Sequence, residues 1–309
     1  MSEHNKTVIA ALQHAPGFEI VSAGDCKITR LGGLTNLVHL VETAGRQVIV
    51  RIPGEGTEEY IDRAVEINNA HAAYRAGVSA KVLWADAATG VMISEAIQNI
   101  ETMTPDLFAS RSGSPARAGA ALAKLHGSGE SFEFRFELFA MIDDYLKILS
   151  TKDVNLPDGY HEIVKAAEPV KDALAANPAP LAPCHCDPLC ENFLDDGDKM
   201  WIVDWEYSGM NDPLWDVGDL SVEAGMNTGQ EMALMEAYFG GRPTAAQHGR
   251  VLIYKAMCDL LWTLWGLIQH ADDNPAEDFW AYATGRFDRC KTLMNDPNFA
   301  GHVAAVKAG

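Results

Sequence analysis

The stretch His185-Cys-Asp-Pro-Leu-Cys-Glu-Asn192, followed by Ile202-Val-Asp-Trp-Glu-Tyr207, decides the fold. It supplies Asp187, Asn192 and then Asp204 at the end of a short apolar run. Phosphoryl transfer from a magnesium nucleotide uses such a set: one carboxylate orients the attacking hydroxyl and accepts its proton, while an amide and a second carboxylate hold the metal. Taken singly, Asp187 could open a turn and Asp204 could end a strand. The spacing of the whole set favours a kinase-like site.

Length and composition set the class of protein. The chain has 309 residues, enough for two lobes of ordinary domain size, and its 48% hydrophobic and 22% charged residues are typical of a soluble globular protein. The N-terminus lacks the basic start and apolar run of a secretory signal, and Lys255 and Asp259 interrupt the most apolar stretch, residues 251–269. We therefore expect a cytoplasmic protein with a buried helix at 251–269 and no membrane insertion.

The net charge narrows the choice of partners. Acidic residues outnumber basic ones, 43 to 24, which gives a formal net charge of −19. Such a chain repels the phosphates of nucleic acids and anionic membrane surfaces, so neither is an expected partner. The charge mildly favours a cationic small molecule, although many cytoplasmic proteins are simply acidic. Because ATP is itself an anion, a nucleotide site here requires local cations and a metal.

Three of the six cysteines lie around His185, in the pattern Cys184-x-Cys186-x-x-x-Cys190. A cluster of cysteine and histidine can bind zinc. Here the spacing is not a paired C-x-x-C, no second pair follows, and the kinase-like motif already uses the loop. We favour small buried thiols in a reducing compartment.

The region from residue 20 to residue 97 has the pattern of a small β-rich lobe. Apolar and β-branched runs separated by turn residues predict strands. Residues 58–76 predict one helix, which Gly77 ends. The predicted strands are 26–31, 37–41, 47–51, 82–84 and 91–94.

The remainder is mostly helical, with short strands near residues 192–194 and 201–203 beside the motif loop. The sequence therefore predicts an α+β, two-lobed fold. A β-rich nucleotide-binding lobe occupies residues 1–97, and a larger, mostly helical lobe for catalysis and acceptor binding occupies residues 98–309. The predicted helices are 114–126, 136–149, 159–176, 231–239, 246–269 and 276–294.

A glycine loop and a charged pair suggest a nucleotide site in the first lobe. At Gly32 and Gly33 the absent Cβ lets the backbone approach phosphate oxygens, and Thr35 adds a hydroxyl. Alone, such a loop is more often a hairpin turn, and it is not the Walker pattern. Protein kinases pair a strand lysine with a helix glutamate to hold phosphates, and Arg51 and Glu66 have the corresponding positions. Arginine keeps the charge and adds a bidentate fork; the alternative is a surface ion pair worth about 0–1 kcal/mol.

Five short motifs occur together along the chain: Leu31-Gly-Gly-Leu-Thr-Asn36, Val50-Arg-Ile-Pro-Gly54, Ile61-Asp-Arg-Ala-Val-Glu66, the loop His185–Asn192 and Asp204-Trp-Glu-Tyr207. In this combination the chain resembles the choline/ethanolamine kinase family, which belongs to the aminoglycoside phosphotransferase superfamily. The resemblance covers roughly residues 28–288, nearly the whole chain. It implies a protein-kinase-like fold.

The resemblance also implies a role for each motif, with ATP and Mg²⁺ as cofactors. Asp187 is implied as the catalytic carboxylate, and Asn192 and Asp204 as the magnesium ligands. Arg51 is implied as a phosphate contact, with Glu66 as its partner. The remaining nucleotide contacts would come from the glycine loop and from a hinge at residues 94–97, whose backbone can bond adenine: Gly32, Gly33, Thr35, Asn36, Glu95 and Ile97.

One position departs from the family pattern. Cys186 stands where family members usually carry asparagine, while His185 and Asp187 are both present. We expect catalysis to be retained and the rigidity of the loop to differ. Asp216 matches a family aspartate that ties down the catalytic loop, so we expect a structural role for it near the site, as for His185.

The acceptor side depends on aromatic residues. The quaternary ammonium of choline has no N–H to donate, and aromatic faces attract it with roughly 0.5–2 kcal/mol per desolvated ring. Trp262 and Trp265 are neighbours on one helical face. Taken alone, such a pair is more often core packing than a binding site. The resemblance reverses that reading and implies acceptor contacts from Glu206, Tyr207, Glu223, Trp262, Trp265 and Tyr282.

The leading hypothesis is an ATP-dependent kinase that phosphorylates the hydroxyl of choline, with Asp187 as its base. Ethanolamine, a primary ammonium, would rely more on Glu206 and Glu223 than on the rings. Thiamine and aminoglycosides are further possible acceptors. A hypothesis of another class is a catalytically silent, ligand-binding pseudokinase, which only Cys186 favours. The oligomeric state is left open.

Overall fold

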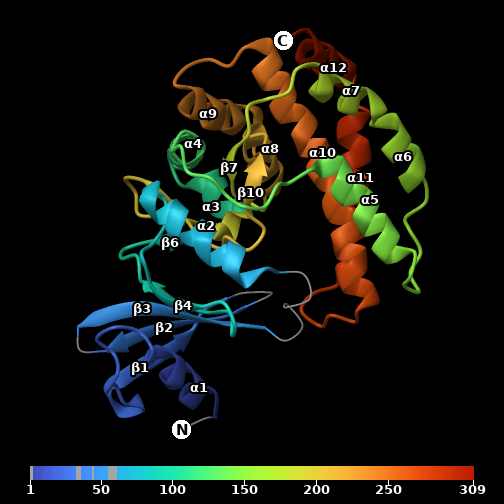
Figure 1. The fold of residues 1–309 in the computed structure, drawn as a ribbon. Helices are drawn as coiled ribbons and strands as arrows, with labels where there is room; N and C mark the ends of the chain where they lie inside the picture. The colour runs from blue at the N-terminus through green and yellow to red at the C-terminus, as the bar shows by residue number, and fades with distance from the viewer. Residues whose placement is uncertain (1–2, 33–35, 44, 55–60) are drawn as a thin grey trace.

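The computed structural model describes residues 3–32, 36–43, 45–54 and 61–309. A five-stranded antiparallel sheet with one helix beside it forms the smaller N-terminal part, and helices dominate the rest, as Figure 1 shows from blue to red. The predicted α+β, two-lobed, kinase-like architecture is confirmed. The strands β1 (Cys26–Arg30), β2 (Asn36–Thr43), β3 (Arg46–Pro53), β4 (Val82–Asp86) and β5 (Val91–Glu95) run in the order β1-β2-β3-β5-β4.

The sheet forms because its β-branched residues alternate between two faces. Val41, Val48 and Val50 are buried on one face and share a core with Leu12. That leucine belongs to α1 (Glu3–Leu12), a helix that the sequence reading did not predict. The helix covers the apolar face of the sheet, which the strands alone would leave exposed to water.

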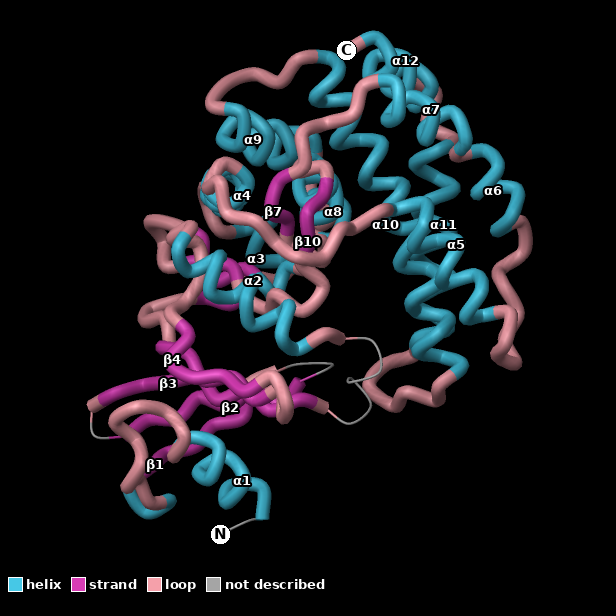
Figure 2. The backbone as a smooth tube through the Cα atoms, viewed as in Figure 1, coloured by secondary structure: helices cyan, strands magenta, loops and turns pink. Residues whose placement is uncertain are grey.

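Helix α2 (Arg63–Arg75) crosses from the sheet toward the helical part (Figure 2). The Asp62 side chain accepts hydrogen bonds from the backbone N–H groups of Ala64 and Val65, which caps the first turn. The helix therefore begins after Asp62, later than the predicted start at residue 58, and residues 55–60 lie outside the described chain. Gly77, at φ +73°, ends it as predicted.

Helix α10 (Ala245–Ala271) is the centre of the C-terminal part, with α5 (Leu138–Leu149), α8 (Leu214–Glu223), α11 (Phe279–Met294) and α12 (Phe299–Ala308) packed around it. By length and composition α10 could cross a membrane, yet 78% of its most apolar window is buried inside the protein. The prediction of a buried helix here is confirmed. The other helices are α3 (Pro105–Ser110), α4 (Ser114–His126), α6 (Tyr160–Ala166), α7 (Glu168–Ala176) and α9 (Thr228–Phe239).

Two predictions about helices were wrong. The single helix expected at residues 159–176 is two, α6 and α7, because Pro169 lies in the first turn of α7 and cannot continue the preceding helix. Helix α8 was missed altogether. It is buried on nearly all sides, although Asp216, Asp219 and Glu223 recur at helical spacing along its sequence.

Short strands hold the loop of residues 185–192 in place. β7 (Ala182–Cys184) precedes it and pairs with β10 (Gly209–Asn211), while β8 (Phe193–Asp195) follows it and pairs with β9 (Met200–Ile202) and β6 (Glu101–Thr102). The chain leaves the N-terminal sheet at Glu95 and enters this second layer at Glu101. The loop is thus fixed at both ends, below helix α8 and facing the N-terminal sheet.

Candidate functional site

One carboxylate anchors the loop that carries Asp187. The backbone N–H groups of His185 and Cys186 donate to the two oxygens of Asp216, at 2.7 and 2.9 Å. Trp215, the preceding residue on α8, donates its indole N–H to the Cys186 carbonyl at 2.9 Å. Both oxygens of this fully buried aspartate are therefore bound to the loop backbone. These contacts support the expected structural role of Asp216.

Cys186 adopts the left-handed backbone conformation, with φ +68°. That conformation costs an ordinary L-residue roughly 1–2 kcal/mol, whereas asparagine tolerates it well. The departure from asparagine at this position thus has a physical cost, which the anchoring contacts to Asp216 and Trp215 offset. Burial raises the pKa of the Cys186 thiol well above its usual range, so the thiol is neutral.

His185 fixes the other side of the loop. Its Nε2 lies 2.9 Å from the Val203 carbonyl, which makes Nε2–H the donor, and its ring packs on Trp205 at 5.0 Å between centroids. Burial lowers the pKa of His185, so the ring is neutral. The contact ties the catalytic loop to the segment that carries Asp204.

The three cysteines near His185 are buried. Cys184, Cys186 and Cys190 are free and buried, and burial raises the pKa of each thiol. Cys184 does lie near His126 and Asp216, with ligand atoms within 4.8 Å of one another. Asp216 already accepts the loop N–H groups, and a ring nitrogen of His126 is 2.9 Å from it. These side chains are used in hydrogen bonds, in agreement with the expectation of structural thiols.

Asp187 and Asn192 are held on opposite ends of one short loop. The Asn192 side-chain N–H donates to the Asp187 carbonyl at 3.0 Å, so the amide oxygen is the atom left to bind a cation. Burial raises the pKa of Asp187 to about 7; the charge of Glu223 adds to the rise and Arg286 opposes it. A carboxyl with that pKa can exchange a proton near neutral pH, which suits a general base.

Asp204 follows β9 at φ +69° and points a buried oxygen toward the same space. Within the described chain its Oδ1 has no hydrogen-bond partner, and its closest cation is Arg51, at 3.6 Å. Burial and then the charge of Glu206 raise the pKa of Asp204. An unpaired buried carboxylate oxygen beside an amide oxygen is a hard-oxygen donor set, which fits Mg²⁺.

The predicted pair of strand arginine and helix glutamate is present. Arg51 on β3 forms an ion pair with Glu66 on α2. Burial disfavours the charged form of Arg51, but Glu66, Asp204 and Glu206 outweigh that effect and raise its pKa. Arg63, which the sequence reading missed, also binds Glu66 at 2.9 Å. Its position three residues before Glu66 on one helix was the signal available.

Glu206 lies on the nucleotide side of this cluster. Its carboxylate accepts hydrogen bonds from Asn36 at 2.9 Å and from Arg63 at 3.3 Å. The structure therefore joins Glu206 to the first turn of α2 and the start of β2.

Two of the predicted nucleotide contacts, Gly33 and Thr35, fall outside the described residues. Gly32 precedes them, and a Cβ there would meet nothing within 4 Å. Glu95 ends β5 and donates its backbone N–H to Lys81, and Ile97 follows in the segment between β5 and β6. The roles of these residues toward ATP stay predictions.

The aromatic residues predicted for the acceptor come together. Trp262 lies 6.0 Å from Tyr207 and 6.4 Å from Trp265 between ring centroids, and Trp265 lies 5.7 Å from Tyr282. The Trp265 indole N–H donates to the Tyr207 hydroxyl at 3.3 Å. Burial raises the pKa of Tyr282, and the charges of Glu223 and Asp187 add to the rise while Arg286 opposes it.

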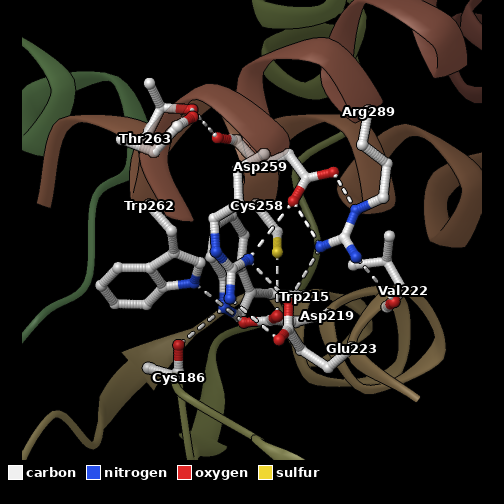
Figure 3. A network of polar contacts seen from close by, with 12 residues as sticks. Cys186, Trp215, Asp219, Val222, Glu223, Cys258, Asp259, Trp262, Thr263 and Arg289 are labelled. Atoms are coloured by element: carbon white, nitrogen blue, oxygen red, sulfur yellow. Dashed lines mark hydrogen bonds and ion pairs between the residues drawn. The ribbon is translucent and has the colours of Figure 1, made fainter. Parts of the chain in front are cut away.

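Beside the rings lies a dense charged network, shown in Figure 3. Arg286 donates to both oxygens of Glu223, at 2.6 and 2.9 Å, and its guanidinium lies 4.4 Å from the centre of the Tyr282 ring. Arg289 binds Asp259 in the same two-point manner. The sequence reading assigned Glu223 here but missed Asp219, Asp259 and the two arginines. Asp219 and Glu223 are one helical turn apart, a signal that was lost when α8 was missed.

Comparisons with known proteins agree with this geometry. The model of the phosphotransferase enzyme family matches residues 27–248. A choline/ethanolamine kinase family protein from Mesorhizobium loti is 59% identical, with a TM-score of 0.90 over 98% of this chain and 99% of that one. The choline kinase LicA from Streptococcus pneumoniae is 25% identical, with a TM-score of 0.77 over 95% and 99%. Ethanolamine kinase 2 from Rattus norvegicus is 27% identical over 83% of this chain and 73% of its own.

Proposed function

This chain belongs to the choline/ethanolamine kinase family of phosphotransferases, and from that premise we propose that it transfers the γ-phosphoryl group of Mg-ATP to the hydroxyl of choline. The products are phosphocholine and ADP. That the chain is an alcohol-acceptor kinase follows from the family. The choice of choline rests on one observation: the aromatic side chains of Tyr207, Trp262, Trp265 and Tyr282 gather in one cluster.

In the proposed reaction Asp187 accepts the proton of the choline hydroxyl as its oxygen attacks the γ-phosphorus. Its pKa of about 7 in the protein alone lets it take that proton at neutral pH. Arg51, held by Glu66, binds the phosphates and orients them for in-line attack. Asn192 and Asp204 would hold Mg²⁺, which neutralises the charge of the phosphates when bound.

The acceptor would be recognised by its cation. A trimethylammonium group is large, weakly hydrated and unable to donate a hydrogen bond, so flat electron-rich ring faces suit it better than carboxylate oxygens do. Tyr207, Trp262, Trp265 and Tyr282 supply such faces.

Ethanolamine is the second candidate, because ethanolamine kinase 2 from rat is among the relatives. Thiamine and aminoglycosides are the further candidates that the same assay tests. The family relationship and the presence of Asp187, Asn192 and Asp204 together argue against a silent pseudokinase.

The deciding experiment is an ADP-release assay with Mg-ATP against choline, ethanolamine, thiamine and kanamycin, with Asp187→Ala as the control. We expect the highest kcat/KM with choline and no turnover in the variant. A clear preference for ethanolamine or another acceptor would refute the assignment of choline while leaving the kinase. Absence of turnover with every acceptor would refute the proposed function as a whole.

A further inference from the structure

Asp219 differs from its charged neighbours in what it is paired with. Three carboxylates, those of Asp219, Glu223 and Asp259, lie close to two arginines, Arg286 and Arg289 (Figure 3). Glu223 and Asp259 are each ion-paired with both arginines. Within the described chain Asp219 forms no ion pair within 4 Å. One carboxyl group of this network is therefore left without a paired cation, and burial raises its pKa well above the usual range.

The partners of Asp219 are neutral. The Cys258 thiol donates to Asp219 Oδ1 at 2.9 Å, and the Trp262 indole N–H donates to Oδ2 at 3.3 Å. The aspartate is 1% exposed, so water does not stabilise its charge. A buried carboxylate with only neutral donors is costly unless a cation lies nearby.

We propose that Asp219 balances the positive charge of the acceptor and determines the preference for a quaternary over a primary ammonium. This inference rests on the proposed function and names a residue that sets its specificity. Trp262 connects the two roles, because its ring belongs to the aromatic cluster while its N–H is bonded to the aspartate. A hydrogen bond from the indole N–H to a carboxylate makes the ring face more electron-rich, which strengthens its attraction for a cation.

The preference for a quaternary ammonium follows from the hydrogen bonds that the carboxylate oxygens of this network already accept. Both oxygens of Asp219, both of Glu223 and both of Asp259 already accept hydrogen bonds from protein donors. A primary ammonium carries three N–H donors and loses affinity where acceptors are not available. A trimethylammonium needs none, and it interacts with Asp219 by charge alone.

The same observation argues against a metal at this place. Asp219, Glu223 and Cys258 have ligand atoms within 4.8 Å of one another. Metal binding would require the arginines to release Glu223 and the thiol to lose its proton, yet burial raises the pKa of Cys258 well above its usual range. A soft organic cation lying over the rings leaves all these hydrogen bonds in place.

The test compares choline with dimethylbutanol, its neutral tert-butyl analogue, in wild-type protein and in Asp219→Asn. Asparagine keeps the shape of the side chain and removes its charge. We expect the wild type to prefer choline strongly, and the ratio of the two kcat/KM values to fall about tenfold or more in the variant. The KM for ATP and the kcat at saturating choline should change little. Because both acceptors are measured in one preparation, the ratio does not depend on how much of the variant is folded.

Glu231→Gln is the matched control. Glu231 is also a buried carboxylate of the C-terminal part, but it pairs with Lys255 and Ser221 on the far side of α8. Its removal should leave the ratio unchanged. Equal losses with both acceptors in Asp219→Asn would overturn the proposal and make Asp219 a structural residue. If neither acceptor is phosphorylated by the wild type, the proposed function fails instead.

The preference for a quaternary ammonium is measured in the same experiment. The ratio of kcat/KM for choline over ethanolamine should exceed one in the wild type and fall in Asp219→Asn. A wild-type protein that prefers ethanolamine would overturn this part of the proposal, whatever the variant does.

Discussion

Two networks of charged side chains lie on either side of Asp187, and each contains two arginines and three carboxylates. They differ in the surroundings of the carboxylate that has the weakest pairing with an arginine. On the nucleotide side Arg51 and Arg63 form ion pairs with Glu66, Asp204 and Glu206. On the acceptor side Arg286 and Arg289 form ion pairs with Glu223 and Asp259, and Asp219 lies near them without one. Each network has three carboxylates for two arginines, and so each has one negative charge in excess.

The difference lies in what surrounds that excess charge. Asp204 keeps a buried oxygen with no hydrogen-bond partner in the described chain, whereas both oxygens of Asp219 are occupied by neutral donors. A bare oxygen can enter the coordination sphere of a small divalent ion. A carboxylate whose two oxygens already accept hydrogen bonds can still attract a bulky cation over the neighbouring rings by charge, without direct contact. On the proposed function, the same charge count would serve a metal on one side and an organic cation on the other.

The largest expected effect comes from removing the excess charge on the nucleotide side. Asp204→Asn should lower kcat by roughly a thousandfold or more, because the metal loses a charged ligand at the transferring phosphate. Steady-state kinetics with a titration of Mg²⁺ would measure it. Asp219→Asn, which removes the corresponding charge on the acceptor side, should leave kcat nearly intact. If Asp204→Asn keeps most of its kcat, the assignment of the metal to the nucleotide-side network is wrong.

Removal of one aromatic ring should change the KM for the acceptor but not the KM for ATP. Trp262→Ala is expected to raise the KM for choline about tenfold or more, since it removes a cation-binding face and a donor to Asp219, and to leave the KM for ATP within about twofold. Initial rates with each substrate varied in turn would separate the two constants. Trp84→Ala, in the N-terminal sheet, is the control. Equal changes in both KM values would mean that Trp262 is only core packing.

The raised pKa of Asp187 predicts a dependence of stability on pH. The folded protein without ligands keeps the proton on Asp187 up to about pH 7, whereas the unfolded chain releases it near 3.8. Between these values the folded state binds more protons, so this residue lowers the free energy of unfolding as the pH rises, by at most about 1.4 kcal/mol per pH unit. Asp187→Asn should therefore gain stability over the wild type from pH 4 to pH 7.

Urea denaturation at a series of pH values, without Mg²⁺ or nucleotide, would measure that gain. A difference between variant and wild type that does not change with pH would contradict the assignment. Saturating Mg-ATP should reduce the difference, because nearby cations favour the ionised carboxylate.

The smallest effect is expected at the strained position of the loop. Cys186→Asn should raise the melting temperature by a few degrees at most, since asparagine adopts the left-handed conformation at a lower cost, of order 1 kcal/mol. Calorimetry of the free protein would detect it. The comparison variant, Cys190→Asn, is at a buried position without a positive φ and should lose stability instead. A destabilised Cys186→Asn would mean that the buried thiol packs better than the strain costs.

The sequence predicted those site residues that lie close to one another along the chain. Asp187, Asn192 and Asp204 lie within one motif, and the pairing of Arg51 with Glu66 follows from a strand and a helix that the apolar pattern reveals. The acceptor network could not be predicted in the same way. Asp219 and Asp259 lie in helices that are buried nearly all round, and spacing within one helix does not indicate which carboxylates of two helices face each other. The contacts of Glu206 with Asn36 and Arg63 depend on how the two lobes meet, which no local pattern encodes.

Helix α8 carries both the residue that anchors the catalytic loop and the residues beside the rings. Asp216, Asp219 and Glu223 lie along one rigid rod, with a rise of about 1.5 Å per residue. The interval between the base and the charge that holds the acceptor is therefore set by helix geometry rather than by flexible loops. On the proposed function, we expect the enzyme to select an alcohol by the number of atoms between its hydroxyl and its cation, as well as by the cation itself.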